Sequence, residues 1–306
     1  MKNNIKQKLN NSLAMKVLRE NKDRAFSTLT DDLDSLIGCK YLWDKFSIPI
    51  GWFYNKRELY KSCLLSSQRN IPIFVDCDLH CGGLSIGNHY TPDKENMLAI
   101  NPNMLLKHDG TREDYCSKYG GSTSAILYAL DGMDDLEEEQ LELLILLDGW
   151  DKQLYSKNKQ FRESGQFFVN QLDMKSIENL RNKHDFEYWT ELSRQFGTYE
   201  KIKVIPSDKG FFNLKWSNGI NENLIKERFK FDISLPTNRF FLIETYTKHY
   251  DEDISVLNDI PREKVKSISE TSYGKVRFSE VDSDGVFLKK ANYERIYLPF
   301  LDDEDE

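Results

Sequence analysis

Several features are scarce in this 306-residue sequence, and each scarcity excludes a class of protein. No run of about 18 apolar residues is present and no signal peptide opens the chain, so we expect a cytoplasmic protein, neither membrane-spanning nor secreted. Only five cysteines occur, all within the first 116 residues, and this odd number favours reduced thiols over a disulfide framework. Lys and Arg number 42 against 50 Asp and Glu, which excludes a generally basic surface that coats nucleic acid but not a local basic groove.

The remaining composition is that of a folded protein. Hydrophobic residues make up 39% of the chain and aromatic residues 12%, which is enough for a substantial core. The length allows two domains or one large one. Part of the negative charge lies in residues 302–306, which we interpret as a solvated acidic tail.

Three acidic clusters lie in order along the first half of the chain. They contain Asp31, Asp32 and Asp34, then Asp76 and Asp78, then Asp148 and Asp151. An apolar run lies beside each cluster, so each indicates a strand end or helix edge that carries carboxylates into a cleft. Carboxylates gathered in this way repel one another unless a cation or a proton lies between them. A divalent metal is the natural explanation, because hard oxygen ligands suit magnesium and manganese.

The order of apolar and polar segments predicts an α/β protein. Residues 1–22 read as a basic amphipathic helix docked on the domain, with a phosphate-contacting arm as the alternative. The elements expected next are helices at 36–46 and 58–67 and strands at 48–54 and 71–75. This alternation is typical of a doubly wound parallel sheet. In such sheets the ligand crevice lies beyond the carboxyl ends of the strands, where Asp76 and Asp78 emerge.

The second half of the chain changes character. A strand at 97–100 and a helix that begins at Ser122 or Thr123 are expected, and that helix start leaves free amides. A further helix at 137–147 leads to the third acidic cluster. We expect an N-terminal domain over 1–150, a helical connector over 151–200, and a smaller α+β lobe over 201–306 with the acidic tail.

Four motifs follow one another in a fixed order: an Asp-x-Asp pair, an aspartate at a strand end, a triplet that ends in histidine, and an aspartate after a helix. They fall on Asp32 and Asp34, on Asp76, on Gly87-Asn88-His89, and on Asp148. This order resembles the DHH phosphoesterase superfamily over residues 28–151, close to half of the chain. The Ser/Thr-rich helix start within residues 120–128 supports the resemblance, because such a segment follows the histidine motif in that family.

The resemblance implies a function. Members of the family hydrolyse phosphodiesters or phosphoanhydrides with manganese or magnesium, so it implies one or two Mn²⁺ or Mg²⁺ ions here. It implies as substrate a nucleotide, a cyclic dinucleotide or a short single-stranded oligonucleotide. It also implies a C-terminal substrate-binding domain that closes over the metal site.

The motifs carry over residue by residue. In the first motif Asp32 and Asp34 hold the two aspartate places, whereas Thr28 stands in place of the histidine. The third motif, Asp-His-His in the family, has become Gly87-Asn88-His89. By resemblance His89 contacts the phosphate or donates a proton to the leaving oxygen. The amide oxygen of Asn88 can ligate magnesium or calcium, but it replaces imidazole poorly at manganese.

Two motifs leave alternatives open. The second motif falls on Asp76, with Asp78 as the alternative, and the fourth falls on Asp148 or Asp151. His80 could supply a nitrogen in place of a lost motif histidine. The resulting candidate metal ligands are Asp32, Asp34, Asp76, Asp78, His80 and Asp148.

Substrate contacts are less clearly marked. No Gly-Gly-His run, typical of the family's C-terminal domain, occurs after residue 200. The candidates for phosphate contact are Ser122 and Thr123 at the helix start, together with Arg239, Lys275 and Arg277.

Three interpretations remain open at this point. The chain is a metal-dependent phosphodiesterase, a degenerate relative that binds a nucleotide without hydrolysis, or a scaffold that uses only the fold. The survival of four acids argues against the scaffold. Zinc at Cys77, His80, Cys81 and His89 is disfavoured, because their spacing matches no ordinary structural zinc site.

Overall fold

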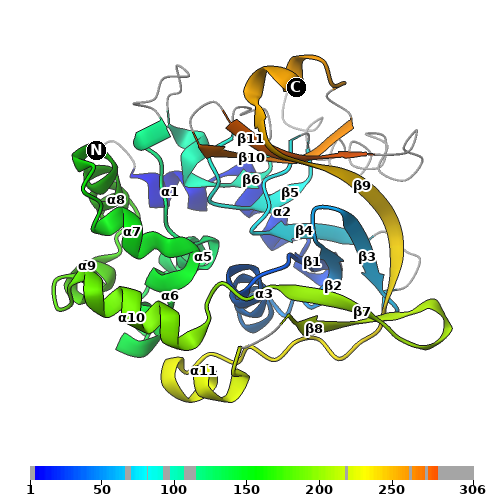
Figure 1. Ribbon diagram of the computed structural model, residues 1–306, viewed down its shortest axis with the longest axis horizontal. Helices are drawn as coiled ribbons and strands as arrows, with labels where there is room; N and C mark the ends of the chain where they lie inside the picture. The colour runs from blue at the N-terminus through cyan, green and yellow to red at the C-terminus, as the bar shows by residue number, and fades with distance from the viewer. Residues whose placement is uncertain are drawn as a thin grey trace.

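The computed structural model describes residues 4–65, 70–80, 82–91, 97–106, 115–217, 220–261, 264–272 and 275–281. These residues form an α/β fold in which eleven strands join one mixed, curled sheet, with most helices gathered on one side (Figure 1). The expected α/β class is therefore confirmed. No helix in the described ranges is both long and apolar enough to cross a membrane.

One end of the sheet is parallel. Its strands lie side by side in the order β2 (Ile50–Tyr54), β1 (Ala25–Leu29), β4 (Ile71–Val75), β5 (Leu84–Ile86) and β6 (Ala99–Ile100). Successive side chains of a strand point to opposite faces. Phe53 therefore joins the main core, whereas Tyr54 belongs to a smaller aromatic cluster with Phe74 and Tyr246. Burial on both faces is what a parallel sheet requires.

Antiparallel strands extend the sheet beyond β2. They are β3 (Glu58–Ser62), β9 (Phe240–Asp253), β11 (Lys275–Val281) and β10 (Val265–Ser272), in that spatial order. The hairpin of β7 (Ile202–Pro206) and β8 (Phe212–Trp216) joins β9 at Phe212 and Phe240. Strand β9 curves along the whole edge of the molecule in Figure 1. Because β9 pairs with β3, residues after 201 add strands to the same sheet as the N-terminal half, and their division into a separate lobe stays a prediction.

Helices cover the sheet and form the opposite side of the molecule (Figure 1). They are α1 (Ile5–Asn10), α2 (Leu13–Glu20), α3 (Leu33–Phe46), α5 (Thr123–Asp131), α6 (Glu138–Leu146), α7 (Trp150–Leu154), α8 (Lys159–Gln171), α9 (Lys175–Arg181), α10 (Phe186–Phe196) and α11 (Glu222–Phe229). Short 3₁₀ turns lie at η1 (Lys22–Arg24), η2 (Pro102–Leu105), η3 (Leu147–Gly149), η4 (Asp208–Gly210) and η5 (Ile254–Asn258). An ion pair between Arg228 and the buried Glu142 fastens α11 to α6.

The helix expected at 58–67 is wrong over its described part. Glu58–Ser62 is strand β3, antiparallel to β2. The cause is a tight turn before it: the side-chain oxygen of Asn55 accepts hydrogen bonds from the amides of Arg57 and Glu58, and Lys56 adopts a left-handed φ of 66°. Asparagine side chains that bond to the following backbone in this way favour turns over helices.

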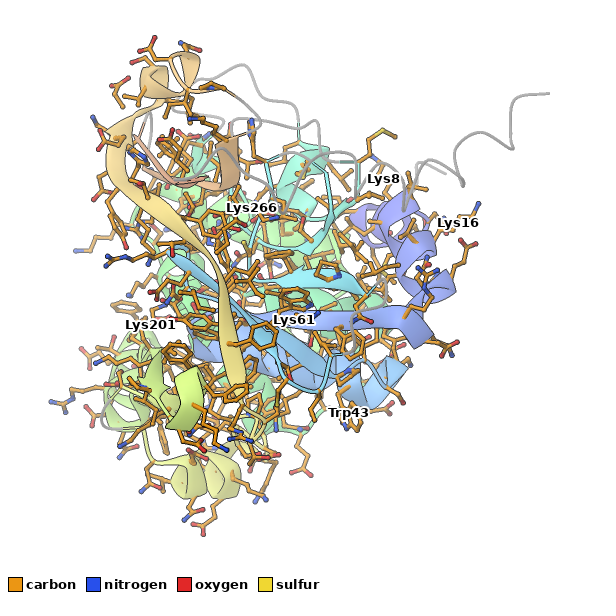
Figure 2. All side chains as sticks on the ribbon, turned by 90° about the vertical axis from the view of Figure 1, so that its right-hand side faces the viewer. Lys8, Lys16, Trp43, Lys61, Lys201 and Lys266 are labelled. Carbon is orange, nitrogen blue, oxygen red and sulfur yellow. The ribbon has the colours of Figure 1, made fainter. Side chains whose placement is uncertain are left out.

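The basic helix expected over 1–22 is broken into α1 and α2. Ser12 starts the second helix by accepting a hydrogen bond from the amide of Met15. Both helices bury an apolar face, which supports the docked interpretation. Figure 2 shows Lys8 and Lys16 on the opposite side of the molecule from Lys201.

Candidate metal centre

The parallel strands all deliver polar residues to one edge of the sheet. Their carboxyl ends lead into Asp31 and Asp32 after β1, Lys56 after β2, Asp76 and Asp78 after β4, Asn88 and His89 after β5, and Asn101 after β6. Parallel strands end on the same side, so these side chains share one rim. The C-terminal strand β10 lies against this rim, because the amide of Ile268 donates to the carbonyl of Asp78.

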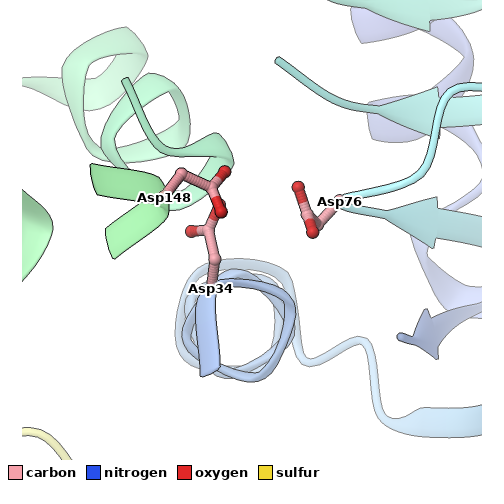
Figure 3. A group of neighbouring side chains, drawn as sticks. All are labelled: Asp34, Asp76 and Asp148. Atoms are coloured by element: carbon pink, nitrogen blue, oxygen red, sulfur yellow. The ribbon is translucent and has the colours of Figure 1, made fainter. Parts of the chain in front are cut away.

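Three carboxylates converge at this edge. Asp34 comes from the first turn of α3, Asp76 follows β4 directly, and Asp148 lies in the corner between α6 and α7 (Figure 3). One oxygen from each lies within 4.8 Å of the others. We call these three residues the carboxylate triad. Asp34 and Asp76 are buried, whereas Asp148 is exposed overall and turns its carboxylate toward the other two.

Two triad members have an unusual backbone. Asp76 and Asp148 both have a φ of 55°, in the left-handed region that residues other than glycine seldom adopt. Such a conformation costs about 1 kcal/mol or more for each residue and concentrates at functional sites. For Asp76 the position is fixed by its amide, which donates to the carbonyl of Ile86 at 2.8 Å. The backbone thus holds both carboxylates at the edge at some cost in stability.

Asp34 is held by the start of helix α5. Its Oδ2 accepts from the amide of Thr123 at 2.7 Å, and its Oδ1 accepts from the amide of Ser124 at 2.9 Å and from the Ser124 hydroxyl. The next amide, of Ala125, donates to the Ser122 hydroxyl. The expectation of free amides at this helix start is therefore wrong, because Asp34 and Ser122 occupy all three.

Thr123 links two members of the triad. Its amide donates to Asp34, and its hydroxyl donates to Asp76 Oδ1 at 2.9 Å. The hydroxyl of Ser122 donates to the carbonyl of Leu144, one turn before the corner that carries Asp148. Both residues, expected as substrate contacts, thus brace the carboxylates in this structure.

Asp32 lies beside the triad but outside it. Its Oδ1 caps α3 by accepting from the amide of Ser35 at 3.1 Å, and its Oδ2 accepts from Lys201 Nζ at 2.9 Å. Burial alone would raise the pKa of Asp32, but the Lys201 ammonium and these hydrogen bonds hold it below its usual value. Of the five expected carboxylate ligands, the structure brings three together in the triad, pairs Asp32 with a lysine, and places Asp78 outside the triad.

The triad resists full ionisation. Burial, followed by the charges of Asp148 and Asp76, raises the pKa of Asp34 well above its usual value. Burial, with the charges of Asp32 and Asp148, raises the pKa of Asp76 to about 8. Loss of water around the carboxylate, with the charge of Asp32, also raises the pKa of Asp148. The cluster therefore holds protons at neutral pH unless a cation replaces them.

The oxygen atoms present fit a hard divalent cation. Three oxygens within 4.8 Å of one another lie at most about 2.8 Å from a common point, so a contraction of a few tenths of an ångström suits calcium and a larger one suits magnesium. Asn88 adds an amide: its Nδ2 donates to Asp148 Oδ2 at 2.5 Å and to the carbonyl of Gly121 at 2.7 Å. The buried Oδ1 of Asn88 has no hydrogen-bond partner among the described residues. Asp34 already accepts three hydrogen bonds, so it offers one remaining lone pair.

Asp78 orients His89 and is not part of the triad. Asp78 Oδ2 lies 3.0 Å from His89 Nδ1 and accepts from the His89 amide at 3.2 Å. Burial would lower the pKa of His89, but the hydrogen bond to Asp78 and the charge of Asp76 raise it. With Nδ1 turned to Asp78, the other ring nitrogen is the one available for proton transfer.

The sequence analysis missed two asparagines that fix this loop. Asn101 Nδ2 donates to Asp78 Oδ1 at 2.7 Å and to the carbonyl of His89 at 2.8 Å. Asn103 Nδ2 donates to the carbonyls of Asn88 at 2.6 Å and Tyr119 at 3.1 Å. Both are almost fully buried. Their place directly after a strand of the parallel sheet was the available signal.

The remaining candidates lie elsewhere. His80 is buried and is held by its amide, which donates to the carbonyl of Lys266, and it is not in the triad. The three expected phosphate contacts form ion pairs with other acids: Arg239 with Asp208 at 3.0 Å, Lys275 with Asp253 at 3.8 Å and Arg277 with Asp251 at 3.9 Å. Cys81, one of the weighed zinc ligands, and the acidic tail at 302–306 lie outside the described residues.

Two lysines that no sequence motif indicated, Lys56 and Lys118, interact with the triad electrostatically. Lys56 lowers the pKa of Asp76, although burial dominates there. Burial lowers the pKa of Lys118 to about 8, against the charges of Glu270 and Asp148. Together with Lys201 on Asp32, they place positive charge around the triad.

A search of protein-family models, of curated proteins and of solved structures finds no match to this chain. The assignment of a function therefore depends on the geometry of the site and on the motif order.

Proposed function

We propose that the chain is a metal-dependent phosphodiesterase that acts on a nucleotide, a cyclic dinucleotide or a short single-stranded oligonucleotide, with Mn²⁺ or Mg²⁺ as cofactor. The observation that carries the proposal is the meeting of Asp34, Asp76 and Asp148 within 4.8 Å at the carboxyl edge of a parallel sheet. A histidine braced by an aspartate lies on the same edge. Metal ligands and a proton donor are the two parts that phosphodiester hydrolysis needs.

Each side chain then has a role. Asp34, Asp76 and Asp148 hold the cation, and the amide oxygen of Asn88 is a further oxygen ligand beside them. When bound, the ion supplies positive charge to the phosphate oxygens and favours ionisation of a water molecule. His89 donates a proton to the leaving oxygen, and Asp78 keeps its ring in the orientation for this transfer.

Lysines at the rim favour an anionic substrate. The charge of Lys56 acts to lower the pKa of Asp76, and the charge of Asp148 opposes the fall in the pKa of Lys118 that burial causes. Both lysines can therefore neutralise non-bridging phosphate oxygens beside the triad. We assign phosphate contact to them in preference to Arg239, Lys275 and Arg277, which are engaged with other acids.

Metal binding and hydrolysis test the proposal together. Mn²⁺ binding is measured by titration calorimetry, and cleavage of bis-para-nitrophenyl phosphate and of a dinucleotide is followed with Mn²⁺ present. We expect the wild type to do both and Asp76→Asn to do neither. Asp131→Asn is the matched control, because Asp131 lies at the far end of α5 in an exposed ion pair with Lys45. A wild type that binds no Mn²⁺ refutes the proposal.

One observation favours the second candidate, a protein that binds a nucleotide without hydrolysis. Asp34 accepts hydrogen bonds from the start of α5, and Asp32 is paired with Lys201. Fewer carboxylate oxygens are therefore available to metal ions than in a full two-metal site. This candidate predicts that a dinucleotide raises the melting temperature while no product forms with Mn²⁺. It also predicts that Lys56→Met weakens binding more than Asp76→Asn does.

A further inference from the structure

Lys201 is placed against the first acidic cluster by both its side chain and its backbone. Its Nζ lies 2.9 Å from Asp32 Oδ2 and 3.6 Å from Asp31 Oδ1. The next residue, Ile202, donates its amide to the carbonyl of Asp31 at 2.8 Å. The start of β7 is thus hydrogen-bonded to the same loop that carries both acids, and this contact fixes the backbone from which the half-exposed Lys201 side chain reaches Asp32.

The position of this ammonium matters because Asp32 is close to the triad. The charge of Asp32 contributes to the raised pKa values of Asp34, Asp76 and Asp148. An ionised Asp32 without a partner would therefore attract a second cation to the edge. Lys201 already supplies a positive charge there, and it does so from a segment 169 residues away in the sequence.

The charges decide how many ions the site accommodates. Asp32, Asp34, Asp76 and Asp148 carry four negative charges when ionised, and Lys201 carries one positive charge. One divalent ion leaves a net charge of minus one, whereas two ions leave a net charge of plus one while the ammonium still lies on Asp32. A second ion would have to displace the Lys201 ammonium from Asp32 or share the carboxylate with it, and both arrangements oppose its binding.

We propose that Lys201 takes the place of a second metal ion, so that the site binds a single divalent cation and the lysine provides the other positive charge. This inference rests on the proposed function, because it concerns the same metal site. An ammonium has three donors, and among the described contacts Lys201 uses one in a hydrogen bond to Asp32. The others are available to an oxygen of a bound phosphate.

Metal stoichiometry tests the inference without relying on activity. Native mass spectrometry and equilibrium dialysis of the full chain with Mn²⁺ alone give the number of bound ions. The variants are Lys201→Met, which keeps the length without the charge, Lys201→Gln, which keeps a donor for Asp32, and Lys201→Arg, which keeps the charge. Lys203→Met is the matched control, because Lys203 is an exposed lysine on β7, two residues further along the chain.

We expect one Mn²⁺ in the wild type, in Lys201→Arg and in Lys203→Met, and a second, weaker Mn²⁺ in Lys201→Met and Lys201→Gln. The melting temperature of these two variants should continue to rise with Mn²⁺ after the first equivalent is bound, which also reports whether they fold. Two ions in the wild type, or one ion in both neutral variants, would overturn the inference and leave the proposed function standing. No ion in the wild type would overturn both.

Discussion

The raised pKa of Asp76 makes a quantitative prediction about Asp76→Asn in the absence of metal. Burial and the charges of Asp32 and Asp148 raise the pKa of Asp76 from 3.8 to about 8. The folded chain therefore keeps a proton on Asp76 that the unfolded chain releases above pH 4. A group of this kind stabilises the fold fully below its unfolded pKa, and the stabilisation is lost as the pH rises through its folded pKa.

The size of the effect follows from the two pKa values. With 3.8 in the unfolded chain and about 8 in the folded chain, Asp76 stabilises the fold by about 4 kcal/mol at pH 5 and by about 0.5 kcal/mol at pH 8. Asparagine resembles the protonated acid, tolerates the left-handed φ of 55°, and can still accept from the Thr123 hydroxyl. Asp76→Asn lacks this pH-dependent loss of stability. Its free energy of unfolding should therefore rise by about 3–4 kcal/mol relative to that of the wild type between pH 5 and pH 8.

Urea unfolding with EDTA at pH 5 and pH 8 measures this difference, and comparison with the wild type cancels the titration of groups that do not interact with Asp76. Asp131→Asn, in its exposed ion pair, should stay within about 0.5 kcal/mol of the wild type at both pH values. Saturating Mn²⁺ should reverse the order at pH 8, because the ion stabilises only the chain that binds it. A wild type whose stability relative to Asp76→Asn does not fall between pH 5 and pH 8 would refute the electrostatic account of the triad.

Two further predictions concern the residues around the triad. His89→Ala should lower the hydrolysis rate by about 10²–10⁴-fold and leave the Mn²⁺ affinity measured by calorimetry unchanged, because His89 contacts Asp78 and not the triad. Weaker Mn²⁺ binding in this variant would instead identify His89 as a metal ligand. Asn101→Ala should destabilise the fold by about 1–3 kcal/mol in urea unfolding, because Asp78 and the His89 carbonyl lose a buried donor; an unchanged midpoint would show that water replaces it.

The location of the site could be predicted from the sequence because it follows from strand direction. The apolar run 71–75 ends in Asp76, and in a parallel sheet such ends gather on one rim. The expected strand at 48–54 and the helices at 36–46 and 137–147 match β2, α3 and α6 to within a few residues. These are long or strongly periodic segments, in which local pattern and tertiary packing agree.

The missed elements are those in which pattern and packing disagree. Leu59 and Tyr60 are neighbours in β3 and both are buried, so the strand lacks the alternation that identifies a half-exposed strand. Besides its neighbour β2, it pairs with β9, which lies about 180 residues away in the sequence. Strand β5 has only three residues, which is too short for a periodic pattern to identify it.

The hydrogen-bond and ion-pair partners of Asp32 and Asp34 could not be predicted from the sequence, for a related physical reason. The Asp-x-Asp spacing places Asp32 and Asp34 at the start of one helix, but it does not determine which cation or donor each will meet. Asp34 meets the amides of Thr123 and Ser124, and Asp32 meets Lys201, through contacts 89, 90 and 169 residues apart. Burial and the neighbouring carboxylates raise the pKa of Asp34 despite its hydrogen bonds to the helix start, whereas the Lys201 ammonium holds the pKa of Asp32 below its usual value. Two aspartates that are equivalent in the motif thus differ: Lys201 favours the ionised form of Asp32, whereas the surroundings of Asp34 favour its protonated form, in which a metal ion can replace the proton.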